Sequence, residues 1–163
     1  MTVKIDGTNT VASPAFTGAD TDTGLQCGTN ELKLVTGGTS RAEINSAGDL
    51  KFNSGFGSVG TAYGCRAWVN FNGTGTVAIR DSGNVSSITD NGTGNYTIAF
   101  TTAMPDANYC VVTTSSYATG VTESMFTTVN GDSLFTTSGF NAKSRDNGST
   151  LRDVNYFFAA VFR

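Results

Sequence analysis

The chain has 163 residues, a net charge of -3 at pH 7 and only 14% charged residues, against roughly 25% in a typical soluble domain. The basic residues are scattered and form no stripe, so we expect no nucleic-acid ligand. Histidine is absent, which excludes histidine-activated nucleophiles and histidine metal sites. The sequence shows neither a secretory signal pattern nor an apolar run near the ~20 residues that cross a bilayer, so we expect cytoplasmic synthesis and no membrane insertion.

Composition favours strands over helices along the whole chain. Glycine supplies 20 residues and proline only two. Threonine is also frequent, and its branched side chain suits a pleated surface. Glycine and asparagine accept the positive φ angles of tight turns. The sequence therefore predicts an all-β protein with many short strands.

Three short strands follow an N-terminal segment, at residues 31–35, 40–44 and 50–52. We interpret 1–24 as an attachment arm and 25–64 as a β-stalk that ends in a glycine-rich linker. Each strand is too short and too polar to bury a core alone, so we expect copies of the chain to pack together.

Copies of the stalk can bury the apolar residues of these short strands along a common axis. The subunit-interface candidates in the stalk are Leu32, Leu34 and Ile44.

The amino-acid composition changes at Cys65, and most of the large aromatic residues lie after this position. Short strands separated by turn residues predict an antiparallel β-sandwich head over 65–163, similar to a jelly roll. The expected strands are 65–71, 76–81, 85–89, 95–101, 109–115, 123–129, 133–137 and 154–163. The pair Asn130-Gly131 predicts a hairpin between two of them.

The last strand is apolar on both faces. Phe157, Ala159 and Val161 share one face, and the residues around Phe158 and Ala160 share the other. Such a strand is either central in the sandwich or covered on its outer face by a neighbouring subunit. We take Phe157 and Val161 as further interface candidates.

Several single residues invite a prediction. The cysteines lack metal or disulfide spacing, and we expect all three to be buried. Trp68 is expected to anchor the core, with a sugar-stacking platform as the alternative. The receptor-binding candidates, which we expect in loops, are Tyr117, Asn141, Lys143, Arg145 and Asp146.

No spacing of acidic residues suggests a catalytic pair, so we expect no catalytic residues and no cofactor. The run from Asp20 to Gly24 faintly resembles a calcium loop, but Gly24 and Leu25 stand where that loop requires an oxygen ligand and a glycine. A turn supported by aspartate and threonine side chains is the expected structure, without metal.

Two stretches carry a resemblance to a known family. The runs PAFTGADTDTGL and NELKLVTGGTSRAEINSAGDLKF resemble stalk modules of tailed-phage fibres. The longer run AWVNFNGTGTVAIRDSGNVSSITDNGTGNYTIAFTTAMPDANYCVV resembles a C-terminal module of tail-fibre and related virion proteins, many from phages of marine bacteria and cyanobacteria. The resemblance implies a homotrimeric virion fibre with a β-sandwich head and no enzymatic activity.

The sequence thus predicts a phage tail fibre that helps adsorption to the host surface through many weak contacts. Its expected partners are two further copies, other virion proteins through residues 1–24, and a host surface glycan or protein. A capsid decoration or connecting protein without a receptor is the alternative. A polysaccharide depolymerase is the remote third reading.

Overall fold

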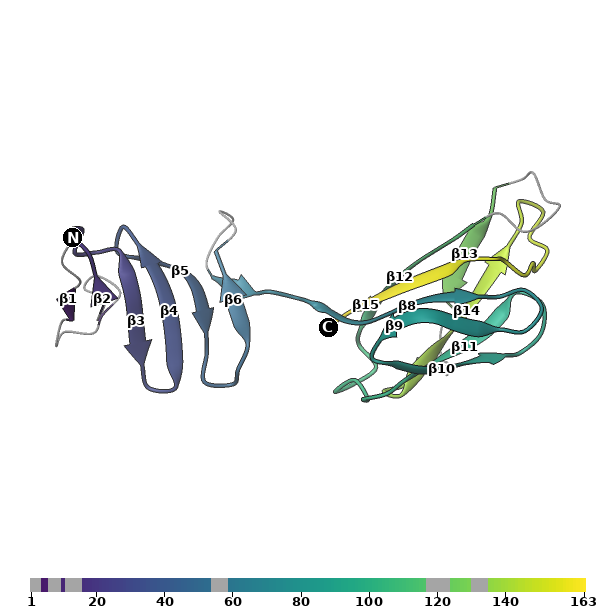
Figure 1. The fold of residues 1–163 in the computed structure, drawn as a ribbon, viewed down its shortest axis with the longest axis horizontal. Coiled ribbons are helices and arrows are strands. Elements are labelled where there is room, and N and C mark those ends of the chain that lie inside the picture. The colour runs from purple at the N-terminus through teal and green to yellow at the C-terminus, as the bar shows by residue number, and fades with distance from the viewer. Residues whose placement is uncertain (1–3, 6–9, 11–15, 54–58, 117–123, 130–134) are drawn as a thin grey trace. The chain divides into compact units, whose positions relative to one another are not determined.

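The structure is a computed structural model that describes residues 4–5, 10, 16–53, 59–116, 124–129 and 135–163. Every regular element in these residues is a β-strand, and all strand pairs are antiparallel, which confirms the all-β prediction. The chain divides into two compact units, residues 1–62 and residues 63–163 (Figure 1). Among the described residues, no helix is long and apolar enough to cross a membrane.

The first unit is one sheet of seven strands in chain order. Its strands are β1 (Lys4–Ile5), β2 (Phe16–Thr17), β3 (Gly24–Gly28), β4 (Glu31–Thr36), β5 (Thr39–Ile44), β6 (Leu50–Phe52) and β7 (Gly60–Thr61). Three of them confirm the strands predicted at 31–35, 40–44 and 50–52. Strands β1 and β2 lie in the segment interpreted as an arm and β7 in the linker, whereas β3 adds a fourth strand at the start of the stalk.

Turn chemistry explains why the strands of the first unit are so short. Gly37 and Gly38 both adopt positive φ, 55° and 65°, and reverse the chain between β4 and β5. Asn45 closes the next turn, because its Oδ1 accepts hydrogen bonds from the backbone N–H groups of Ala47 and Asp49. These local signals fix a meander in which each strand pairs with its neighbours in sequence.

The second unit is a sandwich of two four-stranded sheets, as predicted. Its strands are β8 (Cys65–Asn72), β9 (Ala78–Gly83), β10 (Val85–Asp90), β11 (Asn95–Phe100), β12 (Cys110–Ser115), β13 (Phe126–Val129), β14 (Gly139–Arg145) and β15 (Phe157–Phe162). One sheet has the order β10-β11-β14-β13 and the other the order β12-β15-β8-β9.

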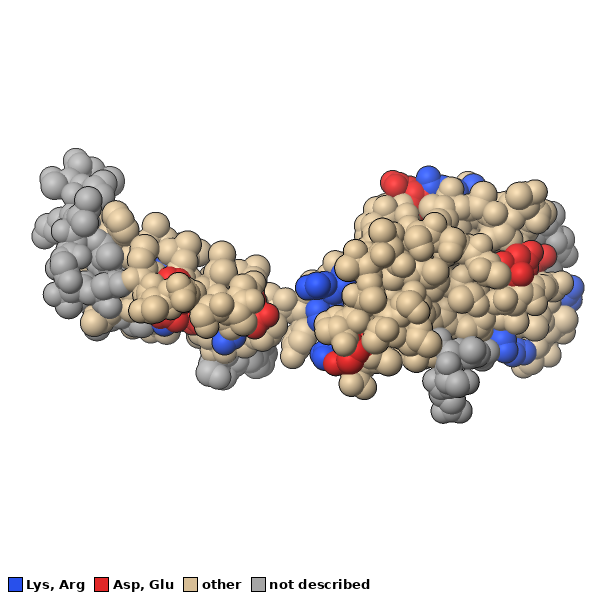
Figure 2. Space-filling view, turned by 90° about the horizontal axis from the view of Figure 1, so that it is seen from below, with Lys and Arg blue, Asp and Glu red and all other residues tan. Residues whose placement is uncertain are grey.

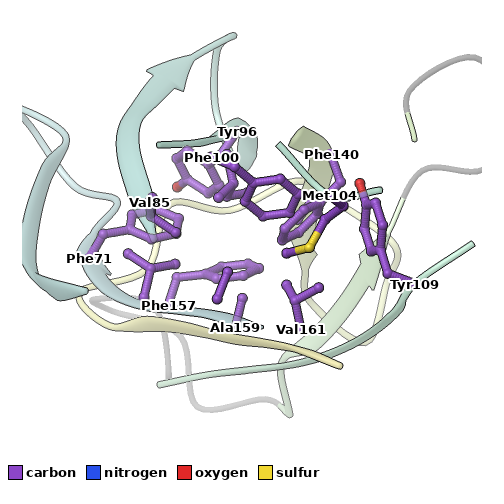
Figure 3. Packing of buried hydrophobic residues seen from close by; sticks show 14 of the residues in the cluster. Phe71, Val85, Tyr96, Phe100, Met104, Tyr109, Phe140, Phe157, Ala159 and Val161 are labelled. Carbon is purple, nitrogen blue, oxygen red and sulfur yellow. The ribbon is translucent and has the colours of Figure 1, made fainter. Parts of the chain in front are cut away.

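The core of the sandwich lies between its two sheets, and side chains from both sheets point toward each other there (Figure 3). The alternate residues Ala67, Val69 and Phe71 of β8 are buried, and so are Tyr96, Ile98 and Phe100 of β11. Phe71 stacks on Phe157 with ring centroids 5.0 Å apart. Tyr96 meets both rings edge-on, a geometry that aromatic pairs favour.

Two sequence predictions fail in the second half of the sandwich. Residues 139–145, expected to be mostly loop, form the internal strand β14, which pairs with β11 and β13. The strand predicted at 133–137 is absent from its described residues, where Thr136 makes only an isolated bridge to Gly139. The hairpin predicted at Asn130-Gly131 lies outside the described residues. Polar side chains on one face of β14 hid its strand character.

Candidate functional site

The seven-stranded sheet carries a continuous row of apolar side chains on one face. Residues directly opposite each other in an antiparallel pair share a face. The first row runs across five strands, through Phe16, Leu25, Leu34, Ala42 and Phe52. We call this row, together with the row beside it, the apolar face of the first unit.

The second row of the apolar face lies two residues along the strands. It runs from Cys27 through Leu32 and Ile44 to Leu50. The seven large apolar residues of the two rows are each 37–54% exposed. This surface is far too continuous to be the usual scatter of single exposed apolar residues.

The opposite face of the same sheet is polar and better shielded. Lys33 lies across from Glu43, and Glu43 lies across from Lys51. Lys33 Nζ lies 2.7 Å from Glu31 Oε1, and Lys51 Nζ lies 4.0 Å from Glu43 Oε1. The Lys33 and Glu43 side chains are only 17% and 16% exposed. The large side chains of the apolar face are therefore more exposed than Lys33 and Glu43, the reverse of the usual order.

The interface candidates fall into two groups. Leu32, Leu34 and Ile44 all lie on the apolar face and are exposed. Phe157 and Val161 point into the sandwich core instead and are almost completely buried, so neither side chain is available for a subunit contact. The strand β15 is internal, between β12 and β8. The residues of β15 that point outward are Phe158, Ala160 and Phe162, none of which was among the predicted interface residues.

Three of the receptor-binding candidates share the outward face of β14. Asn141, Lys143 and Arg145 alternate with the inward residues Ala142 and Ser144. The amide of Asn141 is buried and donates to Asn95 Oδ1 at 3.0 Å. Lys143 and Arg145 are partly exposed. Tyr117 lies outside the described residues.

The fifth candidate, Asp146, organises the turn that follows β14. Its Oδ1 accepts from the backbone N–H of Thr150 at 2.8 Å, and its Oδ2 accepts from Arg152 Nε at 2.8 Å. The Arg152 hydrogen bond, followed by that of Thr150, lowers the pKa of Asp146. The carboxylate is buried at 6% exposure, so its role is to shape this turn rather than to meet a ligand.

Trp68 does not anchor the core. It is 41% exposed and lies on the outward face of β8, opposite Ala160 of β15. The alternation of the strand explains this, because Ala67 and Val69 take the inward positions. The alternative reading of Trp68, an exposed aromatic platform, is the one compatible with its position.

The prediction that the cysteines are buried is also wrong. Cys27, Cys65 and Cys110 are all exposed. Cys27 belongs to the apolar face of the first unit. Cys65 and Cys110 each lie opposite Phe162, on either side of β15.

The turn from Asp20 to Gly24 has the structure predicted for it. Asp20 Oδ1 accepts from the backbone N–H of Asp22 at 3.2 Å, and Thr23 Oγ1 accepts from the N–H of Gly37 at 3.2 Å. In the part of the chain that the structure describes, no group of three or more acidic or cysteine side chains is placed to hold a metal ion.

Sequence reasoning missed four of the seven large residues of the apolar face. Phe16, Leu25, Leu50 and Phe52 were not among the candidates, although each extends the rows of Leu34 or Ile44. The signal was available as apolar residues at every second position of four successive segments. On the side shown in Figure 2, lysine, arginine and acidic residues lie scattered among other residues.

Comparisons with known proteins add little. No family model matches the chain, and no curated protein matches it. Among solved structures, the chain is similar to the phiAB6 tailspike, crystallised in complex with three-repeated oligosaccharides of Acinetobacter baumannii surface polysaccharide. The TM-score is 0.47 and the identity 13%, over 95% of this chain and 38% of the tailspike chain. This chain thus spans well under half of the tailspike, and so distant a likeness carries no conclusion about function.

Proposed function

We propose that this chain is a homotrimeric phage fibre protein that takes part in attachment to the host surface. The first unit associates with its counterparts through the apolar face, and the second unit presents the sandwich to the host. Residues 1–24 contact other virion proteins. The protein acts by binding and not by catalysis, and it resides on the virion.

The apolar face is the observation that carries this proposal. On the scale of about 200 Å² for a large apolar residue, its seven large side chains leave roughly 600 Å² open per copy. A standard protein interface buries about 800 Å² per partner. The face carries no charged residue in its two rows, so identical copies can meet there without burying a charge.

Self-association also accounts for the single layer of the first unit. A sheet with an apolar face requires a second layer to cover it. A closed ring of identical copies supplies that layer by symmetry. Three copies sharing an axis would each turn the rows of Leu34 and Leu32 toward the other two.

The resemblance to phage fibre modules supports the biological setting. A fibre with several equivalent heads needs only weak individual contacts, because linked sites raise avidity by about 10²–10⁴. We assign Lys143 and Arg145, which are partly exposed on the outward face of β14, as contacts to the host surface, together with Tyr117. Asn141 is buried beside them and supports this face through its hydrogen bond to Asn95. Asp146 contributes by holding the adjacent turn.

A pair of matched variants tests the assembly. Leu34→Asp places a carboxylate in the middle of the apolar face, whereas Ser46→Asp adds the same charge in the exposed turn between β5 and β6. Sedimentation velocity should show Leu34→Asp as a single chain whose sandwich stays folded, and Ser46→Asp as the same oligomer as the wild type. An unchanged oligomer for Leu34→Asp would overturn the proposed interface.

The virion role needs a separate experiment. Gold-labelled antibody against the chain should mark tail fibres in electron micrographs, and purified chain should slow adsorption of the phage to its host. Label on the capsid surface, without competition for adsorption, would identify a decoration protein instead. Release of reducing sugar from host polysaccharide would identify a depolymerase.

A further inference from the structure

The outward face of the sheet β12-β15-β8-β9 carries a second group of exposed apolar residues. Trp68 lies opposite Ala160, and Ala160 lies opposite Val112. In the next row, Asn70 lies opposite Phe158, and Phe158 lies opposite Thr114. Cross-strand partners on one face are close neighbours, so these six residues form one surface.

A hollow of about 360 Å³ lies over this surface, lined by the same six residues with Val69, Thr113 and Ala159 beneath. Its volume falls within the roughly 300–1,000 Å³ of small-molecule sites. Alanine at position 160 creates the depression, because its side chain is small between Trp68 and Val112.

The aromatic walls of the hollow are held in place. A Cβ atom on Gly83 would lie 2.5 Å from Trp68 Nε1, so the indole lies directly over this glycine of β9. Phe158 lies nearly parallel to Tyr156, with ring centroids 6.1 Å apart and an interplanar angle of 7°. The guanidinium of Arg80 lies over the Tyr156 ring, 4.2 Å from its centre. This cation–π contact helps to hold Tyr156 beside Phe158.

One polar group of the hollow is unsatisfied. Asn70 Oδ1 is shielded from solvent and has no hydrogen-bond partner among the described residues. An orphaned acceptor of this kind is rare and points to a missing donor. The amide torsion of asparagine is broad, so the side chain of Asn70, which lines the hollow, can turn a polar atom toward a ligand.

The lining selects a ligand class. None of the lining residues is charged, so neither an anion nor a cation is favoured there. The aromatic walls suit a flat apolar surface, whereas Asn70 and Thr114 suit hydroxyl groups. A neutral pyranose sugar has both, since its ring carries C–H faces and hydroxyl edges. A second copy of this chain is a poorer occupant than a sugar. Its sheet would bring a flat surface to a concave one and would leave Asn70 Oδ1 without a hydrogen-bond donor.

We propose that this hollow binds a neutral hexopyranose unit of a host surface glycan, with the sugar ring stacked on Trp68 and Phe158. The inference rests on the proposed host-attachment function and adds to it a glycan site, on the opposite sheet from Lys143 and Arg145, with its ligand class. A shallow site with few polar groups gives a weak single contact, with a dissociation constant on the order of 1 mM. Several copies in one fibre then supply the avidity.

Trp68 is the single tryptophan of the chain, so its fluorescence reports on this site alone. The full chain is titrated with methyl α-D-glucopyranoside, methyl β-D-galactopyranoside and methyl α-D-mannopyranoside, each to about 100 mM. At least one of these sugars should shift the emission and protect Trp68 from acrylamide quenching. Saturation-transfer NMR should show the ring protons of the same sugar in contact with the protein.

Two variants and a control link the signal to the hollow. Ala160→Leu fills the floor and Phe158→Ala removes a wall, and each should weaken binding about tenfold or more. Phe126→Ala removes an exposed aromatic side chain from β13 in the other sheet, and binding should stay unchanged. Thermal unfolding checks that each variant is folded, and failure of one leaves the other as the test.

Two results would overturn the proposal. Either none of the three sugars affects Trp68, or its emission depends on protein concentration and not on sugar, which would show that another copy covers the site. Sedimentation of the same samples separates this failure from that of the proposed function. An assembled fibre that ignores sugar contradicts only the glycan site, and a sugar-binding single chain contradicts only the fibre.

Discussion

The hydroxyl of Tyr96 lies 3.1 Å from Asp153 Oδ1, and this contact joins β11 to the segment that leads into β15. The Tyr96 hydroxyl also lies 3.1 Å from the carbonyl oxygen of Gly73, so this buried hydroxyl has two acceptors within reach. Asp153 is held in turn by the backbone N–H of Gly94 at 2.7 Å. Burial, followed by the charge of Asp153, raises the pKa of Tyr96, so its hydroxyl stays a donor at neutral pH.

Tyr96→Phe should therefore destabilise the sandwich without changing its fold. Phenylalanine retains the aromatic contacts with Phe71 and Phe157 but leaves the Gly73 carbonyl without this donor. The expected loss is about 1–3 kcal/mol in the free energy of unfolding. Urea denaturation followed by tryptophan fluorescence measures it, and an unchanged midpoint would contradict the role of this hydrogen bond.

A glycine pair separates steric from conformational effects. Gly94 and Gly75 have nearly equal φ angles, 60° and 61°. A Cβ on Gly94 would lie 2.6 Å from the carbonyl oxygen of Ser144, whereas a Cβ on Gly75 would meet no atom within 4 Å. Gly75→Ala should cost about 1–2 kcal/mol, the usual penalty of the left-handed conformation. Gly94→Ala should cost roughly 1–3 kcal/mol more, because its neighbours must move.

Thermal unfolding of both variants tests this prediction. Equal losses would show that the space around Gly94 relaxes freely, and they would contradict the close packing of β14 against the Gly94 turn.

The Asp146 turn gives the sandwich a pH-dependent contribution to stability. The pKa of the Asp146 carboxyl group is lowered in the folded state, chiefly by the hydrogen bond from Arg152. The stabilisation is therefore fully present above the unfolded value of about 4 and is lost as the pH falls through the lowered folded value. Asp146→Asn keeps an acceptor for the Thr150 N–H but loses the ion pair with Arg152.

The difference between wild type and Asp146→Asn should be largest near neutral pH and should close in strong acid. Urea midpoints measured from pH 7 to about pH 2 follow this difference. A constant difference across that range would show that the ion pair does not stabilise the fold.

Cys27 provides an internal probe of the apolar face. It is exposed in the single chain, as are Cys65 and Cys110 in the second unit. Because Cys27 shares a row with Leu32, association through that row should cover it. Pulse labelling with a maleimide, read by peptide mass spectrometry, should show Cys27 protected at high protein concentration relative to the other two cysteines.

Urea provides the control for this labelling, since unfolding should expose all three cysteines equally. Equal labelling of Cys27 at every protein concentration would place the contact between copies elsewhere.

Sequence patterns predicted the strands best where alternation and turn chemistry agree. The inward faces of β8 and β11 follow from apolar residues at every second position around Val69 and Ile98. The pattern cannot give strand partners, which depend on contacts far apart in sequence. Strand β14 was missed because the polar residues Asn141 and Lys143 interrupt its apolar pattern. These residues lie in a strand only because β14 pairs with β11 and β13, which the local sequence does not show.

The same limit explains the errors in the candidate sites. Alternation showed that β15 has two apolar faces, but the choice of the outward face depends on which sheet lies behind it. Phe157 points inward because β11 and β14 lie opposite, and Phe158 is thereby left outside. Leu32, Leu34 and Ile44 are exposed on one face of a single-layered sheet, and their role as interface residues stays a prediction.

The mass of the native assembly tests the central claim most directly. Native mass spectrometry of the full chain, with sedimentation equilibrium over a dilution series, should give three times the chain mass of 16.9 kDa. Dissociation should accompany loss of strand signal from the first unit, because its apolar face then returns to water. A stable species of one chain, with the first unit fully folded at micromolar concentration, would contradict the account.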